Sequence, residues 1–207
     1  AYEWLTDKFY LKLIQGGNPF EVVKSMLYPF GISIALVDAG NAFYYIFLRP
    51  FFSLHQSMAI VMIISLLLAN LGMYLLLRKL NINKFLAFII GAAYGYMTFL
   101  MPRGGHLSYW CHYLFPWFYY CAVCLVLDKK KITKILSSVG IAFFFVMMLW
   151  SNFYYFIILL ISIISFLSYF LVKNTKTLFI KFKEVWKYLL FTFLLTFIFL
   201  VPWLLAL

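Results

Sequence analysis

Six long apolar runs constrain this chain more than any other feature of its sequence. Each run approaches or reaches the roughly 20 residues that a helix needs to cross about 30 Å of hydrocarbon. The third run contains Pro116, which a membrane helix tolerates when neighbouring groups replace the hydrogen bonds it disrupts. The sequence therefore predicts an all-α, polytopic bundle with about six transmembrane crossings. The predicted crossings cover residues 57–77, 85–101, 107–127, 135–150, 153–172 and 188–207.

The composition is that of a membrane protein and excludes a soluble domain. Apolar residues make up 66% of the chain, and the mean hydropathy is +0.98. In a soluble protein, a net charge of +11 would suggest a nucleic-acid partner. Here the lysines are concentrated between the apolar runs, where they contact anionic lipid head groups. We therefore expect the lipid bilayer as a partner and no nucleic acid.

The loops between the runs alternate in charge and predict the orientation of the chain. Loops 78–84, 128–134 and 173–187 hold most of the 17 Lys and Arg residues, and basic loops stay in the cytoplasm. The sequence thus predicts a multi-pass protein of the cell membrane, with these three loops cytoplasmic and residues 1–56 and 102–106 outside. Because the chain begins outside and ends within an apolar run, we expect a longer protein with a further crossing before it.

The chain is predicted to divide into an extracytoplasmic segment, 1–56, and a transmembrane bundle, 57–207. Within the first segment, apolar residues recur at three- or four-residue spacing over 2–15, which indicates an amphipathic helix. Such a helix lies along the membrane interface, and Gly16-Gly17 is expected to end it. A second short interfacial helix is expected over about 41–53.

Acidic residues are concentrated in this first segment. Glu3 and Asp7 lie one helical turn apart, an arrangement suited to proton transfer or to a metal ion. The alternative is a solvated helix face balanced by Lys8 and Lys12. Asp38 is a further catalytic candidate, or it caps the short helix that follows.

The outer loop 102–106 combines glycines with a cation. Gly104 and Gly105 permit close backbone approach, and Arg103 with His106 suits an anionic ligand such as a phosphate. The alternative is a tight helix–helix turn with a snorkelling arginine. The three cysteines all lie in the third run. Cys121 and Cys124 lie three residues apart with no His or carboxylate to complete a metal site, so we expect the cysteines to pack rather than to bind metal.

An ordered series of short motifs resembles a known family. The series resembles bacterial polytopic glycosyltransferases of the GT-C superfamily, and its last motif is similar to YfhO-type members in particular. The motifs are Trp4-Leu5, Gly17-Asn18-Pro19-Phe20, Tyr28-Pro29-Phe30-Gly31, Arg49-Pro50, Gly104-Gly105-His106-Leu107, Pro116 and Ser151-Asn152-Phe153-Tyr154-Tyr155.

The resemblance implies sugar transfer at the outer face, from a polyprenyl-phosphate donor to a lipid, wall polymer, glycan or protein. In such relatives an acid in the first outer loop, several residues before the position of Trp4, acts as the base. The candidates in this chain are Asp7, Glu3 and Asp38, since an inverting transfer needs a carboxylate to take the acceptor's proton. A divalent metal ion is a possible cofactor. Arg103 and His106 are expected at the donor phosphate, and Asn18, Tyr28, Gly104 and Gly105 in the substrate cavity.

Two other functions remain open at this point. A transporter or flippase of a lipid-linked glycan would be expected to carry charged residues near the middle of its crossings, or broken helices in two matching halves. The middle of each apolar run holds no Asp, Glu, Lys or Arg, which disfavours ion-coupled transport. A non-catalytic membrane scaffold is the third hypothesis.

Overall fold

The computed structural model describes residues 2–17, 22–23, 32–33, 39–97 and 107–204. The fold is an all-α bundle, as predicted. Within these ranges, one β pairing joins β1 (Val22–Val23) to β2 (Ile32–Ser33), antiparallel and two residues long. The helices are α1 (Tyr2–Ile14), α2 (Ala39–Leu48), α3 (Leu54–Lys79), α4 (Lys84–Met97), the 3₁₀ helix η2 (Leu107–Tyr113), α5 (Leu114–Leu127), α6 (Lys131–Ser151) and α7 (Phe153–Leu204).

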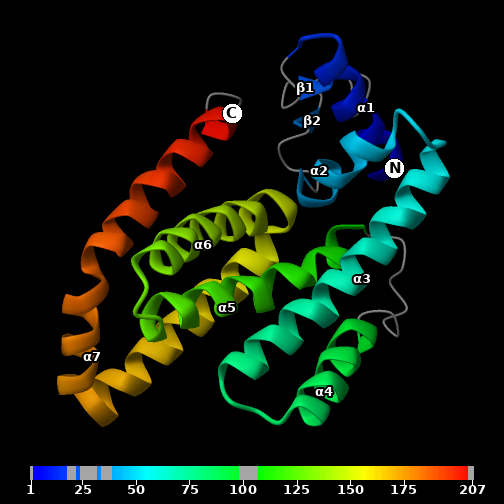
Figure 1. Ribbon diagram of the computed structural model, residues 1–207. Coiled ribbons are helices and arrows are strands. Elements are labelled where there is room, and N and C mark those ends of the chain that lie inside the picture. Colours follow the sequence, from blue (N-terminus) through cyan, green and yellow to red (C-terminus); the bar gives the residue numbers. More distant parts are fainter. Residues whose placement is uncertain (1, 18–21, 24–31, 34–38, 98–106, 205–207) are drawn as a thin grey trace.

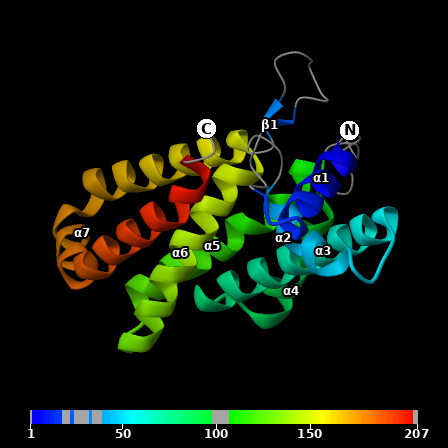
Figure 2. The ribbon, with the colours of Figure 1, turned by 90° about the horizontal axis from the view of Figure 1, so that it is seen from above.

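The helices separate into a long bundle and a small group at one end of it. Helices α3 and α4 form an antiparallel hairpin, and α5, α6 and α7 pack beside it (Figure 1). The short helices α1 and α2 lie together at the end of the bundle where α3 begins, and the view from above shows the same grouping (Figure 2). Helices α1 and α2 therefore pack on the end of the bundle and do not run alongside its long helices.

The length and apolarity of the helices show a multi-pass membrane protein. In the described part of the chain, five stretches are long and apolar enough to cross a bilayer: Leu54–Lys79, Trp110–Leu127, Lys131–Ser151, Tyr154–Lys173 and Phe179–Val201. The expected crossing at 85–101 corresponds to α4, whose 14 residues rise only about 21 Å at 1.5 Å each. Residues 98–101 of that run lie outside the described part of the chain. Five of the expected crossings therefore correspond to helices that are long and apolar enough to span a bilayer, and the described part of the sixth is too short.

The outward surfaces of the bundle are those of a protein in lipid. Phe85 and Phe88 on α4 are 73% and 66% exposed, and Ile164 and Phe166 on α7 are each 62% exposed. Apolar area of this extent is costly in water but compatible with hydrocarbon. We therefore assign these faces of α4 and α7 to the bilayer.

Helix α7 corrects the prediction of a loop over 173–187. That segment is helical throughout and belongs to one 52-residue helix. The segment contains neither Gly nor Pro, so its lysines mark the membrane surface without ending the helix. The helix bends in its orange part and turns back along the bundle (Figure 1). Between its two apolar stretches, the Thr175 hydroxyl donates to the Leu171 carbonyl at 2.6 Å. Back-bonding of this kind commonly bends helices.

Pro116 lies in the middle of the run 107–127, yet it does not break an α-helix there. The run begins as the 3₁₀ helix η2, and α5 starts only at Leu114. Pro116 is therefore the third residue of α5, within the first turn, where a backbone N–H has no intrahelical acceptor. Its missing N–H costs the helix nothing there.

Glycines let the crossing helices approach closely. A Cβ on Gly72 of α3 would lie 2.8 Å from Nε1 of Trp117 on α5, and that Nε1 donates to the Leu68 carbonyl at 3.0 Å. A Cβ on Gly91 of α4 would lie 2.9 Å from the backbone oxygen of Asn70 on α3. Small residues at helix contacts are the usual means of packing where lipid supplies no hydrophobic drive between helices.

The three lysine-rich segments lie at one end of the molecule. The α3–α4 turn, the α5–α6 turn and the bend of α7 all lie away from α1 and α2 (Figure 1). At this end Lys79, in the last turn of α3, forms an ion pair with Asp128, which follows α5. That these segments share one end agrees with the alternation of charge along the sequence. That this end is cytoplasmic stays a prediction.

Candidate functional site

The candidate site is built on α1, whose bounds confirm the helix predicted over 2–15. The predicted stop at Gly16-Gly17 is also confirmed. Gly16 adopts a left-handed φ of 71°, a conformation that glycine reaches without steric cost. Its N–H donates to the Leu13 carbonyl at 3.1 Å, and the Gly17 N–H donates to the Lys12 carbonyl at 2.9 Å. These two bonds form a Schellman motif, which satisfies the last carbonyls of the helix.

Helix α2 confirms the second short helix but is shorter than the predicted 41–53. It ends at Leu48, where a turn takes over: the N–H groups of Phe51 and Phe52 both donate to the Leu48 carbonyl, at 3.0 and 3.1 Å. Helix α3 then starts three residues before the predicted position 57, because Ser53 and Gln56 form a capping box. The predicted boundary between 1–56 and 57–207 therefore falls inside the first turn of α3.

Asp7 joins α1 to α2. Its Oδ1 accepts a hydrogen bond from the Tyr45 hydroxyl at 2.6 Å and another from Nε of Arg49 at 2.8 Å. Tyr45 and Arg49 lie one turn apart, at the end of α2, so their side chains reach the same partner. The three residues, Asp7, Tyr45 and Arg49, are called the Asp7 cluster below.

Tyr45 anchors the cluster to the bundle. Its side chain is fully buried, and it packs with Met58 and Val61 of α3 and with Trp110 of η2. The Tyr10 ring, one turn beyond Asp7 on α1, meets the Tyr45 ring edge to face at a centroid distance of 6.2 Å. These apolar contacts hold the Tyr45 ring in place and so fix the position of the hydroxyl that binds Asp7.

Aromatic residues behind the cluster hold α2 in place. Tyr44 meets the ring of Tyr113 at 6.0 Å, in an edge-to-face contact between α2 and η2. Tyr94 of α4 donates its hydroxyl hydrogen to the backbone carbonyl of His112 at 2.9 Å, and their rings lie 5.5 Å apart. His112 is buried in this layer, which extends the support of the cluster across α4 and η2.

The cluster holds its groups in defined charge states. Burial raises the pKa of Asp7, but hydrogen bonds from Tyr45 and Arg49 outweigh that effect, so the pKa lies below its ordinary value of 3.8. Burial, and then the Asp7 carboxylate, raise the pKa of the Tyr45 hydroxyl well above its ordinary range. At neutral pH, Asp7 is an anion, Tyr45 a neutral donor and Arg49 a cation.

Two polar atoms of the cluster have no hydrogen-bond partner among the described residues. Both bonds to Asp7 use Oδ1, and Oδ2 accepts no hydrogen bond from the described residues. Arg49 uses Nε for Asp7 and Nη1 for the Phe52 carbonyl at 3.3 Å, while Nη2 has no hydrogen-bond partner within the described ranges. Among the described residues, one carboxylate oxygen and one guanidinium nitrogen of the cluster therefore have no hydrogen-bond partner.

The environment of Asp7 differs from the solvated face that Lys8 and Lys12 suggested. Its side chain is 22% exposed and is bound by a residue 42 positions away rather than by a lysine of its own helix. Sequence reasoning did not include Tyr45 among the site residues, and it gave Arg49 only as part of the Arg49-Pro50 motif. The sequence did contain one signal for them. Tyr45 and Arg49 are four residues apart, so a hydroxyl and a cation share one face at the end of the short apolar helix in segment 1–56.

The positions of the other predicted site residues relative to this cluster lie outside what the structure describes. Glu3 belongs to α1, one turn before Asp7, but its side chain is not described. The expectation that the 102–106 loop approaches Asp7 stays a prediction. The remaining site residues lie outside the described ranges: Asn18, Tyr28, Asp38, Arg103, Gly104, Gly105 and His106.

The described residues offer no metal centre. Within those ranges, no group of three or more His, Cys, Asp or Glu side chains is placed to hold a metal ion. The possible divalent cofactor therefore stays a prediction. Cys121 agrees with the packing role predicted for the cysteines. Its Sγ lies so close to Gly140 of α6 that a Cβ on this glycine would be only 2.6 Å from the sulfur.

Comparisons of the chain with protein-family models, with curated proteins and with solved structures found no match. The Asp7 cluster and the membrane setting of the bundle are therefore the features that bear on function.

Proposed function

We propose that this chain is the catalytic part of an integral membrane glycosyltransferase that takes a sugar from a polyprenyl-phosphate donor at the outer face. The observation that carries the proposal is the Asp7 cluster: an ionised carboxylate beside a guanidinium, held where two short helices meet the end of a transmembrane bundle. A lipid-linked donor presents its phosphate at the membrane surface, next to such helices.

Asp7 acts as the base in an inverting transfer. Its Oδ2 takes the proton of the acceptor hydroxyl while the acceptor oxygen bonds to the anomeric carbon. The bond from that carbon to the phosphate oxygen breaks, and the electron pair leaves with polyprenyl phosphate. The lowered pKa of Asp7 keeps the carboxylate ionised at neutral pH, the charge state that a base needs.

Arg49 supports the same step by binding the leaving phosphate. Its Nη2 has no hydrogen-bond partner in the described part of the chain, and a guanidinium stabilises the negative charge that develops as the phosphate departs. Arg103 and His106 of the outer loop are proposed as further phosphate contacts. Tyr45 positions Asp7 and touches no reacting atom.

Release of polyprenyl phosphate tests the proposal. Membranes containing the full-length protein are incubated with polyprenyl-phosphate sugars of several kinds and with an envelope extract as acceptor. Asp7→Asn should lower the rate of release by about 10²- to 10⁴-fold, the usual contribution of a general base. Arg49→Gln should lower it as well.

Asp128→Asn is the matched control, because it removes the same charge from an ion pair at the other end of the bundle. Its release rate should equal that of the wild type, with all variants present in the membrane in equal amount. If Asp7→Asn releases polyprenyl phosphate as fast as the wild type, Asp7 is not the base. If the wild type releases none from any donor, the glycosyltransferase proposal fails.

A further inference from the structure

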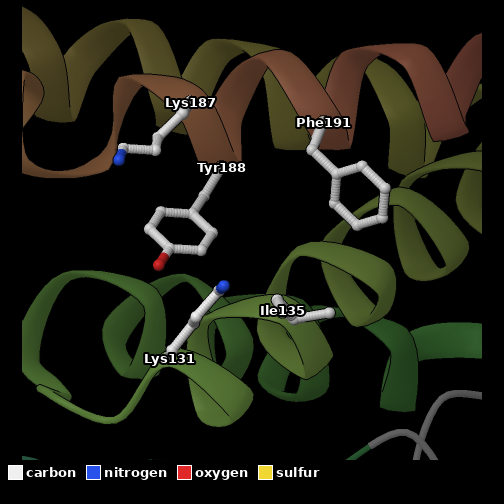
Figure 3. Close-up of a pocket in the computed structure, with 5 residues that line it drawn as sticks. All are labelled: Lys131, Ile135, Lys187, Tyr188 and Phe191. Carbon is white, nitrogen blue, oxygen red and sulfur yellow. The ribbon is translucent and has the colours of Figure 1, made fainter.

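A cavity lies at the opposite end of the bundle from the Asp7 cluster. Its volume is about 470 Å³, and it lies between the first turns of α6 and the Phe179–Val201 stretch of α7 (Figure 3). Five residues line it: Lys131, Ile135, Lys187, Tyr188 and Phe191.

The lining is polar at one end and apolar at the other. Lys131 and Lys187 come from facing helices and lie at the same end of the cavity (Figure 3). Ile135 and Phe191 lie at the other end, each one helical turn further along its helix than the lysine. The cavity therefore runs from the lysine-rich end of the bundle toward its apolar interior.

The charge at the polar end is positive. None of the five lining residues is acidic. A third ammonium group, that of Lys134, lies over the Tyr188 ring at 5.6 Å from its centroid. The carboxylate of Glu184 is bound to Lys181 at 2.9 Å and also interacts electrostatically with Lys134, so one negative charge lies beside these lysines. Like charges on facing helices repel one another unless an anion lies between them.

We propose that this cavity binds one anionic phospholipid of the bilayer. Its phosphate lies between Lys131 and Lys187, and its acyl chain follows Ile135 and Phe191 into the membrane. The phosphate also lies near the N-terminus of α6, where the helix dipole favours negative charge. Basic pockets between transmembrane helices are suited to anionic head groups. A free phosphate would use only the lysine end and leave the apolar end unfilled.

Lipid titration followed by native mass spectrometry tests the site. The full chain is purified in a neutral detergent and titrated with phosphatidylglycerol, with phosphatidylcholine as the uncharged reference. A basic residue near the membrane surface contributes about fivefold to anionic-lipid binding, so Lys131→Gln with Lys187→Gln should weaken phosphatidylglycerol binding by about 30-fold. The control, Lys129→Gln with Lys176→Gln, removes the same charge from the same end and should bind as the wild type does.

A second variant separates the cavity from its charge. Ile135→Trp fills the apolar end and keeps both lysines, so it should also lose phosphatidylglycerol. Inorganic phosphate should not displace the lipid at equal concentration. Unchanged binding in the double lysine variant, equal loss in the control, or displacement by inorganic phosphate would each overturn the proposal. Circular dichroism of each variant establishes that its helices are intact.

Discussion

Gly72→Ala tests the packing of the membrane bundle most sharply. The Trp117 indole covers Gly72, and a Cβ there would lie 2.8 Å from Nε1 and 2.9 Å from Cδ1 of that ring. Ordinary contact needs about 3.4–4 Å. The ring has little room to move, because it stacks on Phe144 at 6.2 Å and meets Tyr120 at 6.1 Å. We expect the substitution to push α5 away from α3.

The expected magnitude follows from three terms. Overpacking a filled contact costs about 1–3 kcal/mol. The displaced indole also loses its hydrogen bond to the Leu68 carbonyl, now 3.0 Å, which costs about 1 kcal/mol more. Alanine offsets about 1 kcal/mol of this, because it favours a helix more than glycine does. Gly72→Ala should therefore lower the free energy of unfolding by about 1–3 kcal/mol.

Thermal unfolding in detergent measures this effect. A loss of 1 kcal/mol lowers Tm by about 2–4 °C in a protein of this size, so we expect a fall of about 2–12 °C. Gly17→Ala is the control, because its Cβ meets only the Lys12 carbonyl, at an ordinary 3.5 Å. It should leave Tm within about 2 °C of the wild type. An unchanged or higher Tm for Gly72→Ala would refute the described contact between α3 and α5.

Two further predictions concern the charged contacts. Because the pKa of Asp7 is lowered in the folded state, the stability that it adds is complete above its ordinary pKa of 3.8 and is lost as the pH falls through the lower folded value. Hydrogen exchange of α1 amides, corrected for intrinsic rates, should thus increase at about pH 3 relative to pH 6 in the wild type but not in Asp7→Asn. Asp128→Asn should lower the free energy of unfolding by about 0–1 kcal/mol, because its pair with Lys79 is partly exposed. A fall in Tm as large as that of Gly72→Ala would contradict this.

Features that depend on local sequence could be predicted. Gly16-Gly17 ends α1 because glycine alone reaches the required backbone geometry without strain, and that requirement is visible in the sequence. The apolar runs could be recognised because lipid demands about 20 apolar residues wherever a helix crosses. The loop predicted from the lysines of 173–187 was wrong. This stretch contains no Gly or Pro to end a helix, so its backbone stays helical.

The Asp7 cluster could not be predicted, because it joins residues far apart in the sequence. Lys8 and Lys12 are near Asp7 along the chain, yet Arg49 binds it. That choice depends on how α2 lies against α1, and the buried ring of Tyr45 fixes this orientation through its contacts with α3 and η2. Helical spacing indicates which residues share a face but does not indicate which face a second helix will cover.

The central claim is that the Asp7 cluster faces the outside of the cell and the lysine-rich ends face the cytoplasm. Single-cysteine labelling tests it most directly, after the native cysteines at 111, 121 and 124 are replaced by alanine. Gln15→Cys at the end of α1 and Lys130→Cys before α6 are both exposed positions. In intact cells, an impermeant maleimide should label the cysteine at 15 and should reach the cysteine at 130 only after permeabilisation. Labelling of both positions from the outside, or of position 130 alone, would contradict the account.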